Sequence, residues 1–100
     1  MTDTNKPIQS DGGSSSYYDL KLSKKTIDFI KENGYVKTEQ IIKDVFDNDF
    51  DFGNSFKSQV RLYGITKGAG KAGNSAHYES NKIKYSLDKI TSSLEDTTNE

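Results

Sequence analysis

The stretch from Phe52 to Tyr85, FGNSFKSQVRLYGITKGAGKAGNSAHYESNKIKY, decides how this chain folds and which kind of ligand it favours. It begins with a short helical pattern, continues through a glycine-rich loop at 64–75, and ends in a second amphipathic segment. From Lys57 to Lys84, six basic residues stand against one acid, in a chain whose net charge is −1. This local excess of positive charge favours an anionic partner, most simply a phosphate.

The composition predicts one small domain between two polar tails. The chain has 100 residues, of which 31% are hydrophobic and 29% charged. Residues 1–14 and 95–100 contain almost no large apolar side chains, so we expect them to be mobile tails around a helical domain at 15–94. A core of this size is marginal for a monomer, which predicts a homo-oligomer.

The composition excludes several kinds of chemical site and cellular location, because the chain lacks the residues that they require. It has no cysteine and a single histidine, which excludes disulfides, thiol nucleophiles and zinc sites built from cysteine and histidine. No apolar run is long enough to span a membrane, and the N-terminal segment does not resemble a signal peptide. The expectation is therefore a cytosolic protein that does not bind membranes.

The apolar pattern predicts an all-α fold, a compact domain of about four helices. Ser23 is expected to cap a helix that runs through Asn33 and ends at Gly34. Thr38 is expected to cap a second helix, and its apolar residues share one face. These residues are Ile41, Ile42, Val45 and Phe46.

The third predicted helix carries a basic pair. It is expected to run from Asn54 to Tyr63, to stop at Gly64, and to bury a stripe of apolar side chains. The stripe consists of Phe56, Val60 and Tyr63. Lys57 and Arg61 lie four residues apart and therefore project from one face of this helix.

The last segment has two possible secondary structures. Asn74 or Ser75 is a candidate cap for a helix whose apolar residues recur in steps of four, three and four. These residues are Ile83, Leu87, Ile90 and Leu94. Apolar residues also alternate over residues 83–87, as in a strand, which would make residues 65–87 a hairpin wing. The helix is favoured because only a helix accounts for the continuation to residue 94.

The glycine-rich loop resembles nucleotide-binding motifs in part of its residue pattern, but the residues and secondary structure around it do not fit them. Residues 68–73 read G-x-G-x-x-G, yet a helix precedes them where a dinucleotide-binding fold requires a strand. A Walker A loop would need glycine in place of Ile65 and serine or threonine in place of Ala72. Glycines still allow close approach to a phosphate, and Lys67 and Lys71 add positive charge.

No metal site or catalytic group is expected. The acidic turn at 47–51 resembles a calcium loop, but Phe52 and Ser58 occupy the positions where that loop requires glycine and glutamate. The one histidine, His77, has no identifiable partner for a nucleophilic relay. We expect binding rather than turnover, with magnesium required only if the protein is a kinase.

One short motif resembles a known family. The pattern F-x-x-G-N-x-x-K-x-x-x-R, a Gly/Lys-rich loop and a helix ending L-D-x-I are similar to small phage-encoded helical proteins, some of which are labelled nucleotide kinases in podophages. The matching positions are Phe50, Gly53, Asn54, Lys57, Arg61, Lys82, Leu87 and Asp88. The Ser-Ser-Tyr-Tyr segment at 15–18 resembles the entry motif of the same proteins. Over residues 15–91, the resemblance implies a phage protein that acts on nucleotides in the host cytoplasm.

These observations predict a phage protein that binds a phosphorylated nucleotide and sequesters a nucleotide signal used in host defence. Two alternatives are a nucleoside monophosphate kinase and a winged-helix protein that places residues 54–63 in the major groove of DNA. The predicted ligand-binding residues are Ser16, Tyr17, Tyr18, Asn54, Lys57, Arg61, Lys67, Lys71 and Lys82. In this interpretation Tyr17 or Tyr18 stacks on the base, and Arg61→Ala abolishes binding without unfolding the protein.

Overall fold

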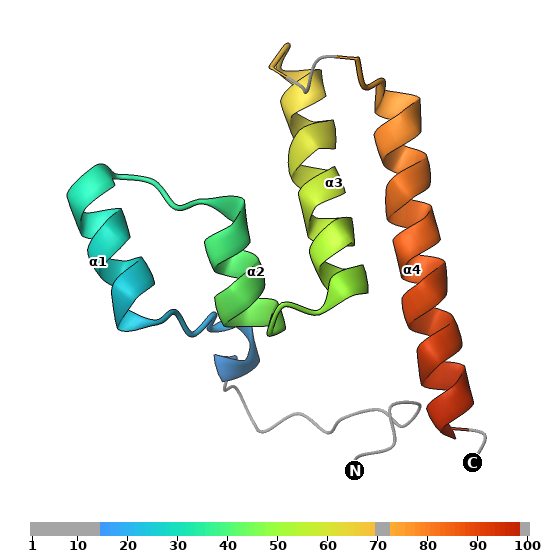
Figure 1. Cartoon of the computed structure of the whole chain (residues 1–100), viewed down its shortest axis with the longest axis horizontal. Helices are drawn as coiled ribbons and strands as arrows, with labels where there is room; N and C mark the ends of the chain where they lie inside the picture. Colours follow the sequence, from blue (N-terminus) through green and yellow to red (C-terminus); the bar gives the residue numbers. More distant parts are fainter. Residues whose placement is uncertain (1–14, 70–72, 99–100) are drawn as a thin grey trace.

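The computed structural model describes residues 15–69 and 73–98, and all of its regular elements are helical (Figure 1). The elements are the 3-10 helix η1 (Ser16–Tyr18) and the α-helices α1 (Lys24–Asn33), α2 (Thr38–Phe46), α3 (Phe50–Thr66) and α4 (Ala76–Thr98). The predicted all-α class is confirmed, and residues 83–87 are helical rather than a strand. The predicted tail at 1–14 lies outside the described residues, whereas α4 continues past residue 94 to Thr98.

Helix α1 begins and ends as the sequence predicts. The Ser23 hydroxyl accepts a hydrogen bond from the Thr26 N–H at 3.2 Å, and Gly34 ends the helix with a φ of 79°. Helix α2 begins at Thr38, but its N-cap is Lys37 rather than Thr38. The Lys37 N–H donates to Oε1 of Gln40 at 2.9 Å, so the side chain of the third helical residue satisfies the N–H of the N-cap.

A carboxylate joins the start of α1 to α2. The Ser23 N–H donates to Oδ2 of Asp44 at 2.9 Å. This hydrogen bond is the main reason that the pKa of the Asp44 carboxyl lies below its ordinary value. The contact positions α1 beside α2 without a large apolar interface.

Helix α3 starts earlier than the sequence predicted. Asp49 caps it by accepting from the Phe52 N–H at 2.9 Å, so the helix begins at Phe50 and not at Asn54. Gly53 therefore lies within the helix, where an added Cβ would approach Cγ2 of Ile42 to 3.1 Å. The missing side chain lets α2 and α3 pack closely. Gly64 likewise lies within α3, which ends at Thr66.

The core is small and largely polar. Ile42 is the only large hydrophobic side chain that is buried among the described residues. The most buried side chains of α3 and α4, which lie side by side in Figure 1, are Ser55, Ser58, Glu79 and Ser86. Beside α2, the rings of Phe46 and Phe52 stack at 5.9 Å, and Phe56 lies 5.7 Å from Phe46. The predicted buried stripe of α3 is wrong at two positions, because Val60 is 46% and Tyr63 62% exposed.

We expect Ile42→Ala to lower the free energy of unfolding by about 2–5 kcal/mol, because it leaves a cavity beside Gly53. The matched control is Ile27→Ala on α1, where the side chain is already 39% exposed. Urea unfolding followed by circular dichroism at 222 nm measures both variants. Equal losses for the two variants would contradict a core centred on Ile42.

Candidate functional site

An ion pair joins α3 to α4 near the loop that connects them. Nε of Arg61 donates to Oε2 of Glu79 at 2.8 Å, and the Glu79 side chain is fully buried. The other end of the guanidinium donates to Oγ of Ser58 at 3.2 Å. The Asn74 side-chain amide donates to the same carboxylate oxygen of Glu79. One buried carboxylate therefore joins α3 to α4 and also binds Asn74, which lies in the loop before α4.

The surroundings of Glu79 keep its carboxyl ionised. Burial acts to raise the pKa of this group, but the hydrogen bonds from Arg61 and Asn74 and the charge of Arg61 outweigh burial. The pKa of Glu79 consequently lies below its ordinary value. The oxygen Oε1 is buried and has no hydrogen-bond partner among the described residues, which increases the dependence of the carboxylate on the donors at Oε2.

This geometry changes the interpretation of Arg61. Its guanidinium is bound to a buried acid within the protein, although the sequence predicted that it contacts phosphate. Breaking such a pair by removing one partner typically costs about 3–5 kcal/mol. Arg61→Ala is therefore expected to destabilise the protein, contrary to the prediction that it abolishes binding without unfolding.

The remaining predicted ligand residues are spread over the molecule. Ser16, Tyr17 and Tyr18 form the exposed helix η1, in which the two rings lie 4.3 Å apart. Lys57 is exposed on α3, and Lys71 lies outside the described residues. The predicted residues that meet at one place are Asn54 on α3 and Lys82 on α4.

At the C-terminal end of α3, Lys67 is exposed and contacts an aromatic ring of its own helix. Its Nζ lies 4.9 Å from the centroid of the Tyr63 ring. This contact places Lys67 away from Asn54, which lies in the first turns of α3. Lys67 therefore belongs to a different part of the surface from Lys82 and Asn54.

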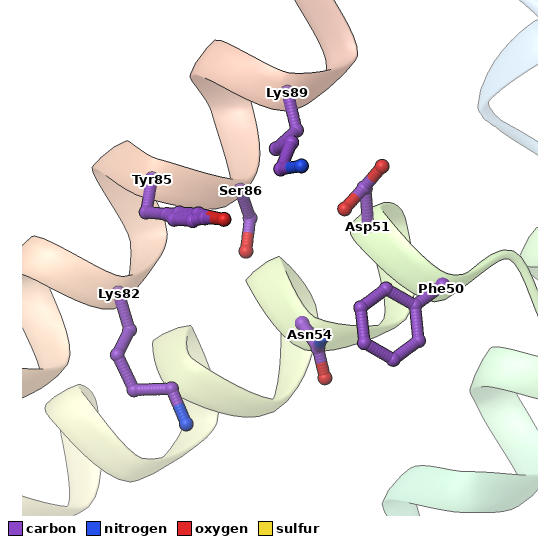
Figure 2. Close-up of a pocket in the computed structure, with 7 residues that line it drawn as sticks. All are labelled: Phe50, Asp51, Asn54, Lys82, Tyr85, Ser86 and Lys89. Atoms are coloured by element: carbon purple, nitrogen blue, oxygen red, sulfur yellow. The ribbon is translucent and has the colours of Figure 1, made fainter.

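The meeting place is a hollow of about 360 Å³ between the first turns of α3 and the middle of α4 (Figure 2). Two aromatic and two basic side chains line it, together with three smaller polar ones. Phe50, Asp51 and Asn54 come from α3, and Lys82, Tyr85, Ser86 and Lys89 come from α4. The hollow brings together residues of α3 and α4 that are 28 to 39 positions apart in the sequence, because the two helices run in opposite directions.

The aromatic surfaces of the hollow are open to a ligand. Phe50 is 79% and Tyr85 55% exposed. Nζ of Lys89 lies 5.6 Å from the centroid of the Tyr85 ring, so a cation adjoins one of these surfaces. In Figure 2 the side chains of Lys89 and Asp51 point toward each other from opposite helices. The site can hold a flat aromatic group together with an anion.

Sequence reasoning missed Tyr85 and Lys89, although a signal for them exists. Tyr78, Lys82, Tyr85 and Lys89 lie at steps of four, three and four, and therefore form one face of α4. Nζ of Lys82 also lies 5.6 Å from the Tyr78 ring, repeating the contact between Lys89 and Tyr85. The sequence prediction used only the apolar face of this helix and therefore did not include the basic and aromatic face that lines the hollow.

Comparison of the chain with protein-family models, with curated proteins and with solved structures gave no match. Within residues 15–69 and 73–98, no group of three histidine, aspartate or glutamate side chains is placed to hold a metal ion. In the same ranges, no helix combines the length and apolar character needed to cross a membrane.

We expect the stability of the protein to fall in acid partly through Glu79. Because the pKa of Glu79 is lowered in the folded state, its contribution is present above the pKa of the unfolded chain and is lost as pH falls through the folded pKa. Glu79→Gln should cost about 1.5–3 kcal/mol at pH 7 and should weaken the pH dependence below about pH 4.5. Urea midpoints measured from pH 7 to pH 3 test both expectations.

The control for this experiment is Glu32→Gln, which changes an exposed carboxylate on α1. It should leave the midpoint at pH 7 and the acid dependence nearly unchanged. Asp44, whose pKa is also lowered, contributes equally to the wild type and both variants, so the differences between them report on Glu79. Identical acid profiles for the two variants would contradict the role of the buried pair.

Proposed function

We propose that this protein binds a phosphorylated nucleotide in the hollow between α3 and α4. The observation that carries the proposal is the joint presence of two exposed aromatic surfaces and two lysines in one hollow. Phe50 and Tyr85 offer stacking surfaces for a base, and Lys82 and Lys89 offer charge for a phosphate. Asn54 and Asp51 can accept hydrogen bonds from the exocyclic amine of a base or from a sugar hydroxyl.

The size of the hollow supports a mononucleotide as the ligand. Its volume of about 360 Å³ is at the lower end of typical small-molecule sites. Two charge-assisted contacts contribute about 3–6 kcal/mol and two aromatic contacts about 1–3 kcal/mol. Together these correspond to dissociation constants from about millimolar to micromolar. The tighter end of this range suits sequestration of a signal.

The biological role that we propose follows from this site and from the resemblance to small phage-encoded proteins. A phage protein with such a site would sequester a nucleotide signal of host defence in the cytoplasm of the infected cell. The winged-helix alternative requires a hairpin wing at residues 65–87, but residues 83–87 belong to helix α4. The kinase alternative involves the same ligand, a nucleotide. A test for turnover therefore has to distinguish a kinase from a binding protein.

We expect wild-type protein to bind AMP or ATP in isothermal titration calorimetry, and Tyr85→Ala and Lys82→Ala each to weaken binding by about tenfold. The matched control is Tyr63→Ala, since Tyr63 is equally exposed and contacts a lysine four residues on, but lies outside the hollow. Its affinity should be unchanged. Absence of nucleotide binding by the wild type, or equal losses in the control, would reject the proposal.

The same preparation distinguishes binding from turnover. Wild-type protein is incubated with ATP, magnesium and each nucleoside monophosphate, and the products are separated by anion-exchange chromatography. A binding protein leaves the nucleotides unchanged. Formation of a diphosphate that is lost in Lys82→Ala would establish the kinase alternative instead.

A further inference from the structure

Helix α4 carries an apolar seam that the rest of the described chain covers only in part. Ile83, Leu87, Ile90 and Leu94 recur in steps of four, three and four, the spacing of the a and d positions of a coiled coil. Ile83 and Ile90 are partly covered, whereas Leu87 is 49% and Leu94 43% exposed. One edge of the seam therefore faces outward along the length of the helix.

Helix α3 covers one side of the seam, because the half-buried Ile83 and Ile90 each lie one turn after a buried residue that faces α3. Glu79 and Ser86, which are buried, lie on the side of α4 that faces α3. In Figure 1, α4 also continues well beyond the first turn of α3, so the end of the seam has no helix opposite to it. With Ile42 as the only buried large hydrophobic among the described residues, the chain has few other apolar contacts to stabilise it.

Charges beside the seam indicate what covers it. Lys84 and Asp88 lie one turn apart on the flank of the seam that is turned away from Glu79. If two copies of α4 pack antiparallel, the two-fold axis brings each lysine toward the opposite aspartate. A parallel arrangement would instead place like charges at the same level. The seam is therefore complementary in charge to an inverted copy of itself.

We propose that a second copy of this chain packs antiparallel against the exposed edge of the seam on α4, with the two-fold axis beside Leu87. The two α4 helices form the centre of a four-helix bundle, and each α3 lies on the outside. Lys84 pairs with Asp88 of the partner subunit on both sides of the two-fold axis. This surface of α4 forms the homo-oligomer that is expected from the small size of the core.

The dimer leaves the nucleotide hollow open. Tyr85 and Lys89 face away from the seam, because they lie on the face of α4 that also carries Tyr78 and Lys82. Each protomer thus keeps a complete hollow, and the dimer is expected to bind two nucleotides. The dimer and the nucleotide site are separate proposals, and either can fail without the other.

Sedimentation equilibrium of the full chain tests the interface. The wild type is expected to sediment at twice the chain mass of 11.2 kDa, and Leu87→Asp at the mass of a single chain. The control Tyr78→Ser changes an exposed side chain on the opposite face and should remain a dimer. A wild-type protein that is monomeric at about 100 μM, a concentration above most specific dimer dissociation constants, would overturn the proposal.

A charge exchange keeps the test valid if Leu87→Asp fails to fold. Lys84→Asp places two acids together at each end of the interface and should weaken the dimer by about tenfold. The double variant Lys84→Asp with Asp88→Lys restores opposite charges and should recover the wild-type dissociation constant. Recovery supports antiparallel pairing of two copies, whereas a double variant as weak as the single one rejects it.

Discussion

The structure depends on the buried ion pair between Arg61 and Glu79. Helices usually set their relative position through interlocking apolar side chains, but the most buried positions of α3 and α4 are serines and this carboxylate. Contacts between serines allow one helix to slide along the other. The hydrogen bonds of Arg61 and Asn74 to the Glu79 carboxylate do not, because they require one relative position. A buried pair is weak evidence for net stability. We infer that its main contribution here is to fix the register of the α3–α4 hairpin.

That register creates the candidate site. Because Arg61 lies near one end of α3 and Glu79 near the start of α4, the opposite ends of the two helices are aligned by the same contact. The first turn of α3 then faces the middle of α4, and Phe50 and Tyr85 line opposite sides of the hollow. In the proposed site, Arg61 would act from a distance, by positioning α4, and the lysines of α4 would contact the phosphate.

The sequence predicted the caps of α1 but missed the local caps of α2 and α3 and the distant partner of Arg61. Ser23 and Gly34 define α1 correctly, because a cap acts within one turn. The prediction that α3 starts at Asn54 is wrong, because Asp49 caps the helix four residues earlier and Gly53 lies within it, where it allows close packing against Ile42. The sequence predicts Arg61 as a phosphate contact but does not reveal its ion pair with Glu79, which is 18 residues away, because a count of charges does not show pairing.

The most direct test of this account is an ¹H–¹⁵N correlation spectrum of the full chain, recorded during a titration with ATP. The account predicts that the amide signals of Asn54 and Tyr85 shift progressively, while the Nε–H signal of Arg61 stays unchanged because it remains bound to Glu79. Shifts confined to Arg61 Nε–H and to the amides of Tyr17 and Tyr18 would contradict it. That result would place the ligand at Arg61 and helix η1 instead of in the hollow.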